Sequence, residues 1–275
     1  MNDLLTWFGL KRHPFDKQIK TSDLFGSGAL AEAAARLDYI KQRGGTMLLT
    51  GDPGVGKTVA LRRFVDGLND NLYRPVYTPL ATLNRFDILR HLNQKLGLVH
   101  RGSKSALYTQ IQRELLESKD QRGKTVVLIT RSCTRLLGVD EAQMLSTGTL
   151  HEIRLMTNFR MDSYEPFILI LAGQSDLRRV LEFAVMEPLA QRLRMRYHVS
   201  PLTTEETAAY VAHQLALAGT AEPIFHPDAL GALHEQSFGI PRRIGNIATQ
   251  AMLYAMVEHK RTIDADMVLK VKTGG

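Results

Sequence analysis

A short segment in the first quarter of the chain has the residue types that hold phosphate groups. Residues 51–58 read Gly-Asp-Pro-Gly-Val-Gly-Lys-Thr and match the pattern G-x-x-x-x-G-K-[ST] at every fixed position. Backbone N–H groups of such a loop converge on phosphate oxygens, and its glycines allow the close backbone approach that this requires. Lys57 would reach the β- and γ-phosphates, and the Thr58 hydroxyl would hold Mg²⁺. The segment predicts a site for a nucleoside triphosphate.

The flanks of this segment have the order that a phosphate loop requires. A short apolar run, residues 46–50, precedes it, and residues 59–68 follow it with apolar side chains at helical spacing. Strand, glycine loop and helix therefore succeed one another, so that loop and helix N–H groups can point into one concavity. The residues expected to contact the nucleotide are Gly51, Asp52, Pro53, Gly54, Val55, Gly56, Lys57, Thr58 and Val59.

Hydrolysis of the nucleotide needs further groups, and two adjacent carboxylates supply them. Asp140 would complete the metal shell, and Glu141 would act as the base that activates water. Residues 130–139 separate these acids from Ile129, in the apolar run 125–130. Either that run is the core strand and an inserted loop returns the acids to the site, or the strand is 136–139. Because small displacements of catalytic groups reduce rates strongly, nucleotide binding is a firmer expectation than turnover.

The elements that must position these residues alternate between strands and helices up to residue 200. Strands are predicted at 46–50, 73–77, 125–130, 167–172 and 194–199, with helices at 29–42, 59–68, 85–96, 105–119 and 150–159. Pro75 indicates an edge position or the start of a strand. Beyond residue 200 the pattern is helical, at 204–218, 227–236, 242–258 and 264–270. We predict an α/β fold with a parallel sheet, divided into a strap and helix (1–45), a core (46–200) and a helical lid domain (201–275).

The order of motifs along nearly the whole chain resembles the AAA+ ATPases, a branch of the P-loop NTPases with a five-stranded parallel sheet. The resemblance is carried by the phosphate loop, Asp140-Glu141-Ala142-Gln143, Ala172-Gly173-Gln174, Leu189-Ala190-Gln191-Arg192-Leu193 and Gly239-Ile240-Pro241-Arg242. The chain looks more closely like the general secretion pathway protein A (ExeA-like) branch. Its opening Phe8-Gly9-Leu10 with Pro14-Phe15, and the segment 201–207, agree with that branch.

The resemblance implies roles for three further residues. Gln174 takes the sensor-1 position, and Arg242 is the sensor-2 arginine that reaches the γ-phosphate from the lid. Arg192 would be the arginine finger that acts on the ATP of a neighbouring subunit. Arg194 and Arg196 lie close by and remain alternatives, because a strand orients alternate side chains alike.

The N-terminal strap holds aromatic residues with two open interpretations. Pro14 and Phe15 would pack on the adenine ring, or they would be a plain hydrophobic anchor.

The charge is unevenly distributed. The chain has 35 Lys and Arg against 28 Asp and Glu, a formal net charge of +7, while residues 201–275 carry six basic and eight acidic residues. The basic excess therefore lies in residues 1–200, where it predicts a polyanionic partner such as DNA or, equally, a solvated basic surface. Arg101 and Lys104, in a basic connection between two helices, are candidate phosphate contacts.

These features favour some functional classes over others. The single cysteine, Cys133, excludes an internal disulfide framework and predicts a reducing, cytoplasmic location, and no apolar run is long enough to span a bilayer. Our first hypothesis is an ATP- and Mg²⁺-dependent, DNA-binding regulator of transposition, similar to MuB/TniB/TnsC-type ATPases. It would form homo-oligomers on double-stranded DNA and recruit a transposase. The alternatives are an assembly or secretion ATPase with a protein partner, and a nucleotide-binding scaffold without turnover.

Overall fold

The computed structural model describes residues 3–16, 19–79, 85–99, 102–131, 147–159, 164–220 and 222–271. The chain divides into two compact units, each built from segments that are distant in sequence. The helical unit consists of Met1–Ala31, Asp52–Val59 and Val199–Gly275, and the sheet unit consists of Glu32–Gly51 and Ala60–His198.

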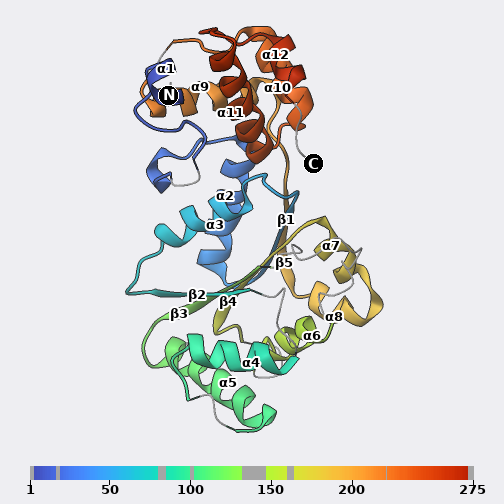
Figure 1. Cartoon of the computed structure of the whole chain (residues 1–275). Helices are drawn as coiled ribbons and strands as arrows, with labels where there is room; N and C mark the ends of the chain where they lie inside the picture. Colours follow the sequence, from blue (N-terminus) through green and yellow to red (C-terminus); the bar gives the residue numbers. More distant parts are fainter. Residues whose placement is uncertain are drawn as a thin grey trace. The chain divides into compact units, whose positions relative to one another are not determined.

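The sheet unit contains a five-stranded parallel sheet, as the sequence predicts (Figure 1). Its order is β2-β3-β4-β1-β5, and the strands are β1 (Gly45–Gly51), β2 (Tyr73–Pro79), β3 (Thr125–Arg131), β4 (Phe167–Ala172) and β5 (Leu193–Val199). Every residue of the inner strands β1 and β4 is buried, as expected for parallel strands covered on both faces. Pro75 lies in β2 at the edge, where the missing N–H interrupts no inner ladder.

The position of β3 decides which of two segments, 125–130 or 136–139, is the core strand before Asp140 and Glu141. Thr125–Arg131 pairs in parallel with β2 on one side and β4 on the other, so this run is the core strand. Arg131 lies opposite Ala172, the last residue of β4. The chain therefore leaves β3 at the carboxyl edge of the sheet. Asp140 and Glu141 themselves lie outside the described residues.

Helices cover the sheet on both faces. Figure 1 shows α4 (Arg85–Lys95) and α5 (Lys104–Asp120) on one side of the sheet and α2 (Gly28–Arg43) and α3 (Lys57–Asp66) on the other. The first side also receives α6 (Thr147–Met156) and α7 (Ser175–Glu182), which join α4 and α5 in one apolar cluster on alternate strand residues such as Leu128, Leu169 and Leu171. The described part of this unit also contains a one-turn 3-10 helix (Ala184–Met186) and α8 (Glu187–Ala190).

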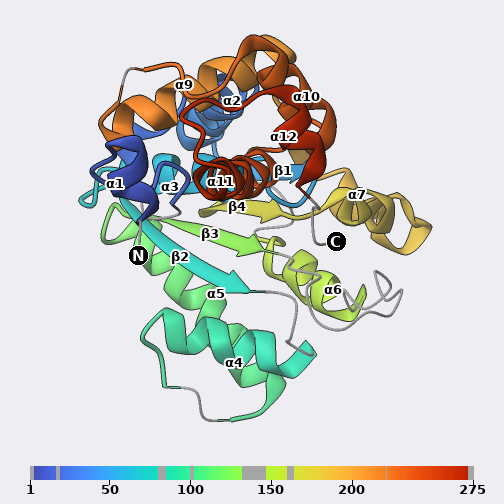
Figure 2. The same ribbon diagram turned by 45° about the horizontal axis from the view of Figure 1, so that its top comes forward.

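The helical unit has its own core. Its helices are α1 (Leu4–Phe8), the 3-10 turn Thr21–Asp23, α9 (Thr204–Ala218), α10 (Pro227–Ser237), α11 (Pro241–Val257) and α12 (Ala265–Lys270). The predicted starts of α9 and α12 are confirmed, because Thr203 forms a capping box with Glu206 and the Asp264 side chain accepts from Met267 N–H. Figure 2 shows α1 beside these C-terminal helices, and Leu4 and Phe8 are buried in their apolar core.

Candidate functional site

The phosphate loop has the predicted strand, loop and helix around it. β1 ends at Gly51, and α3 begins at Lys57, two residues earlier than the sequence pattern suggests. Gly54 and Gly56 adopt φ values of 97° and 112°, a region that favours glycine strongly. The loop therefore needs its glycines for backbone conformation.

Lys57 lies within the loop that it is expected to serve. Its side chain is buried, and Nζ donates a hydrogen bond of 2.8 Å to the carbonyl oxygen of Asp52. The Val55 N–H donates to the same oxygen at 3.4 Å. An ammonium group is thereby held against the concave backbone of the loop, where phosphate oxygens would bind.

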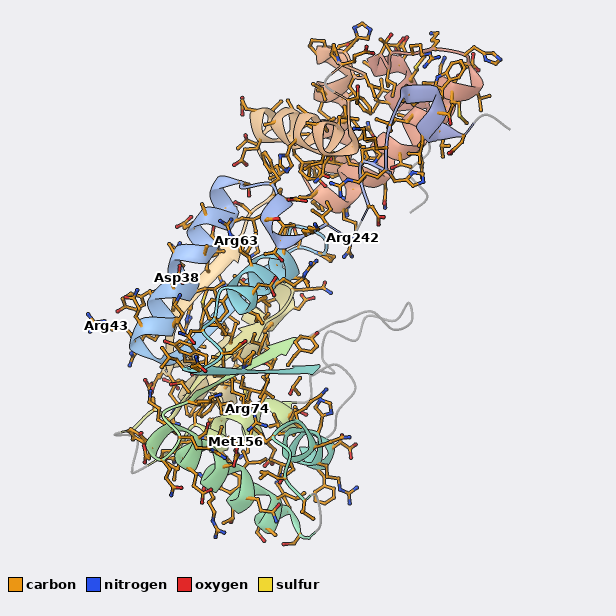
Figure 3. All side chains as sticks on the ribbon, turned by 90° about the vertical axis from the view of Figure 1, so that its left-hand side faces the viewer. Asp38, Arg43, Arg63, Arg74, Met156 and Arg242 are labelled. Atoms are coloured by element: carbon orange, nitrogen blue, oxygen red, sulfur yellow. The ribbon has the colours of Figure 1, made fainter. Side chains whose placement is uncertain are left out.

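Arg242 lies directly against the phosphate loop. A Cβ on Gly54 would lie 2.8 Å from Arg242 Cβ and 3.1 Å from Ile240 Cγ2, so no side chain larger than hydrogen fits there. Arg242 is exposed in the first turn of α11 (Figure 3). The helical unit therefore brings a guanidinium group and the glycine loop together, although 188 positions separate Gly54 from Arg242.

Phe15 packs against α11 one turn beyond Arg242. Its Cβ would lie 3.1 Å from a Cβ on Gly245, and its ring centroid is 6.4 Å from that of Tyr210. Burial in this aromatic cluster raises the pKa of Tyr210 to about 12. Pro14 is buried. These contacts account for Pro14 and Phe15 as a hydrophobic anchor, and their contact with adenine stays a prediction.

Gln174 occupies the carboxyl edge of the sheet next to the strand that leads into the loop. It follows β4 and is the N-cap residue of α7, while the preceding Gly173 N–H donates to Leu49 O of β1 at 3.0 Å. A Cβ on Gly173 would lie 2.6 Å from Leu177 Cδ2, so the backbone here is closely packed. This is the edge at which ligands bind in open α/β sheets.

A family profile described as "AAA domain" matches residues 40–181, which is more than half of the chain. The chain belongs to the AAA family. This confirms the resemblance to AAA+ ATPases, and with it an α/β P-loop NTPase fold that binds nucleotide.

Individual proteins similar to this AAA chain agree with that assignment. General secretion pathway protein A of Aeromonas hydrophila is 35% identical over 266 residues, which are 92% of this chain and 45% of that protein. The chain thus spans less than half the length of this relative. The ORC2 protein of Aeropyrum pernix, solved as ADPNP-ADP complexes, is 17% identical with a TM-score of 0.64, covering 95% of this chain and 71% of its own. The Aeropyrum pernix ORC1 protein in complex with DNA is 15% identical with a TM-score of 0.62, covering 94% and 68%.

Arg192 lies at the amino edge of the sheet, the end opposite Gly51 of β1. It lines a cavity together with Gly45 and Phe167, the first residues of β1 and β4. Its Nη1 donates to Thr157 Oγ1 at 2.5 Å, and that hydroxyl donates to Arg154 O at 2.7 Å. The seven residues of β1 separate this edge from Gly51 by roughly 20 Å. The role of Arg192 as an arginine finger stays a prediction.

The two alternative fingers have partners on the same edge. Arg194 Nη1 donates to Arg43 O at 2.7 Å, and its Nη2 pairs with Glu165 at 3.0 Å. Arg196 Nη2 donates to Ala190 O at 2.8 Å. Both side chains lie on the exposed face of β5, as alternation along a strand requires. The choice among the three arginines stays open.

Lys104, a candidate DNA contact, already has a protein partner. Its Nζ pairs with Glu152 Oε1 at 2.5 Å, and the Glu152 side chain is 2% exposed while that of Lys104 is 50% exposed. The lysine therefore compensates a buried carboxylate of α6. Arg101 lies outside the described residues, and contact of either residue with DNA stays a prediction.

Two residues that form these contacts could not be identified from the sequence. Thr157 and Glu152 contact Arg192 and Lys104 across 35 and 48 positions, and both come from α6 or its end. Among the described residues, no helix is both long and apolar enough to cross a membrane.

Proposed function

We propose that this AAA+ ATPase binds ATP with Mg²⁺, assembles into homo-oligomers and binds double-stranded DNA in its triphosphate state. It would act in the cytoplasm as a regulator of transposition that recruits or activates a transposase, like ATPases of the MuB/TniB/TnsC type. The proposal depends first on the nucleotide site and then on the charge of the chain.

The close approach of Gly54 to Arg242 carries the nucleotide part of the proposal. A loop that excludes a Cβ at Gly54, holds Lys57 inside and faces a lid arginine suits an anionic ligand. ATP would supply the phosphoanhydride bond whose hydrolysis resets the protein. Residues 51–59 would hold its phosphates, and Thr58 with Asp140 would hold Mg²⁺.

The groups proposed for hydrolysis divide between two edges of the sheet. Gln174 lies at the carboxyl edge, where β3 also ends, and Glu141, the proposed base, follows β3 in the sequence. Arg192 lies at the amino edge and would act on the nucleotide of a neighbouring subunit. Hydrolysis would then require an assembled pair of subunits, because each site is completed from outside.

The basic excess supports DNA as the partner. The formal net charge is +7, and residues 201–275 contribute none of this excess. Positive charge in excess supplies non-specific affinity for duplex DNA through phosphate contacts and counterion release. The fold is also that of the Aeropyrum pernix ORC1 protein, which was solved in complex with DNA.

Binding of a labelled duplex with no nucleotide, ADP, ATP and a non-hydrolysable ATP analogue tests the proposal. We expect tight binding only with the triphosphates. Between 50 and 200 mM salt the affinity should fall roughly a thousandfold if about six phosphates are contacted. Lys57→Ala, which removes the loop ammonium, is the control for nucleotide dependence. Equal DNA binding in all four nucleotide states would contradict the proposal.

A second candidate is an assembly ATPase that acts on a protein partner. The 35% identity to general secretion pathway protein A favours it, since that relative covers 92% of this chain. This candidate predicts ATP-dependent oligomers that are indifferent to DNA. Comparing phosphate release by the parent chain and Glu141→Gln further separates both ATPases from a scaffold, in which the two rates would be equal.

A further inference from the structure

The phosphate loop is packed on two sides by side chains at the starts of two helices. A Cβ on Gly56 would lie 3.3 Å from Leu30 Cδ2, in the first turn of α2. A Cβ on Gly54 would lie 3.1 Å from Cγ2 of Ile240, the N-cap residue of α11, beside the Arg242 contact described above. All these residues belong to the helical unit. The conformation of the loop therefore depends on how Leu30 and Ile240 are held.

One short segment, from Leu202 to Glu206 at the entry to α9, contacts the supports of both side chains. On one side, Leu202 N–H donates to Gly239 O at 2.9 Å, and a Cβ on Gly239 would lie 2.1 Å from Leu202 O. Gly239 directly precedes the N-cap residue of α11. On the other side, Glu206 Oε1 accepts from Gly28 N–H at 2.7 Å, in the first turn of α2. The entry to α9 therefore fixes both helix starts that pack on the loop.

The carboxylate of Glu206 serves two helix N-termini at once. Its Oε1 accepts from Gly28 N–H of α2, and its Oε2 accepts from Thr203 N–H at 3.1 Å in the capping box of α9. The first N–H groups of a helix have no intrahelical partner and carry partial positive charge, so an anion stabilises both helix starts. The position needs two acceptor oxygens, which a carboxylate supplies, whereas an amide supplies only one.

We propose that Glu206 is a positioning residue for nucleotide binding, which acts through Leu30 on the phosphate loop. This inference rests on the ATP binding proposed above and assigns part of it to a residue outside the loop. With the bond to Gly28 in place, the start of α2 holds Leu30 against Gly56, and the loop is ordered before ATP arrives. Without that bond the first turn of α2 frays, so ATP itself must order the loop and its affinity falls.

Calorimetric titration with ATP and Mg²⁺ tests this role in Glu206→Gln. Glutamine at this position of α9 keeps the capping box, because its amide oxygen can accept from Thr203 N–H. It then presents an NH₂ group to Gly28 N–H, so the substitution removes the contact with α2 selectively. We expect the Kd for ATP to rise roughly tenfold, since a charge-assisted hydrogen bond is lost.

Glu205→Gln is the matched control. It removes the same charge from the adjacent residue, whose carboxylate accepts from the Thr203 hydroxyl at 2.8 Å and, within the described residues, has no hydrogen bond to α2. Its Kd for ATP should stay within about twofold of the parent value. A Glu206→Gln variant that binds ATP as tightly as this control would overturn the role of Glu206 alone. A parent chain that does not bind ATP would overturn the proposed function as well.

A double-mutant cycle with Leu30→Ala shows whether Glu206 acts through this leucine. Leu30→Ala alone should also weaken ATP binding, because it removes the side chain that packs on Gly56. If Glu206 acts through Leu30, the double variant binds ATP little more weakly than either single variant. Losses that multiply, or a Leu30→Ala variant with the parent Kd, would contradict this route. A purely structural role would lower the urea midpoints and leave the Kd values of the folded variants unchanged, which would contradict it equally.

Discussion

At the scale of single residues, substitution of Lys57 is the clearest test of whether the phosphate loop binds ATP. The Lys57 ammonium group is buried beside the Asp52 carbonyl and would pair with phosphate oxygens. Lys57→Ala should weaken ATP binding by about 1.5–3 kcal/mol, or roughly 10- to 150-fold in Kd, measured by calorimetric titration. Lys41→Ala, on the surface of α2, is the control. An unchanged Kd for Lys57→Ala would place the nucleotide elsewhere.

Substitutions at two neighbouring residues, Phe238 and Gly239, should change the stability of the fold in opposite directions. Phe238→Gly should raise the free energy of unfolding by about 1 kcal/mol, since glycine adopts φ 54° without steric cost. Gly239→Ala should lower it by more than about 2 kcal/mol, because its Cβ would lie 2.1 Å from Leu202 O. Urea midpoints of the two variants measure both effects. A destabilised Phe238→Gly would show that the ring contributes packing within the fold.

The phenol of Tyr210 gives a prediction about pH. Its pKa is raised from 10.0 to about 12, so above pH 10 the unfolded chain releases this proton while the folded chain keeps it. This contribution to stability is complete below pH 10 and is lost as the pH rises toward 12. Urea midpoints should therefore fall less steeply with pH for Tyr210→Phe than for the parent chain. Tyr39→Phe, at a residue of α2 that is 45% exposed, should follow the parent chain.

At the scale of elements, one ion pair joins α5 to α6. Glu152 is buried and Lys104 is half exposed, so removing the lysine leaves a carboxylate that solvent compensates incompletely. Lys104→Ala should lower the free energy of unfolding by about 1–3 kcal/mol, less than a fully buried pair would lose. Adding Glu152→Gln should recover part of this loss. Lys41→Ala removes a pair whose carboxylate, Asp38, is 54% exposed, so it should cost below about 0.5 kcal/mol in the same denaturation experiment.

The Lys104→Ala variant also tests whether Lys104 contacts DNA or has a structural role alone. If Lys104 also binds phosphate, Lys104→Ala reduces the salt dependence of DNA binding, while Glu152→Gln alone does not. If its role is confined to the ion pair, both variants bind DNA with the slope of the parent chain.

Elements with strong local signals could be predicted from the sequence, and short ones could not. The inner strands β1, β3 and β4 are apolar runs, and α9 and α12 begin at capping residues, so neighbours in sequence specify them. α1 and α8 have five and four residues, too few for an isolated helix, and packing in the tertiary structure holds them. The candidate site shows the same division. The glycine loop is local, whereas the contacts of Arg242 with Gly54 and of Arg192 with Thr157 depend on the fold.

At the scale of the whole molecule, the phosphate loop joins two cores. The chain passes from the sheet unit to the helical unit after Gly51 and returns after Val59, so the loop and the start of α3 lie between the two crossings. Each unit has a separate apolar cluster. A ligand held by this loop would therefore be linked through the chain to both cores.

Nucleotide binding should make the two cores unfold as one. An ATP analogue at about 100 times its Kd adds about 2.7 kcal/mol to the stability of the binding-competent state. For a chain of this size that shifts Tm by roughly 5–10 °C, and it should bring the calorimetric and van't Hoff enthalpies toward equality. Differential scanning calorimetry with and without the analogue measures both quantities, and Lys57→Ala should show neither change. A ligand that raises Tm while leaving two separate transitions would show that it engages one core alone. The Arg242 guanidinium and the side chains at the carboxyl edge of the sheet would then act independently of each other.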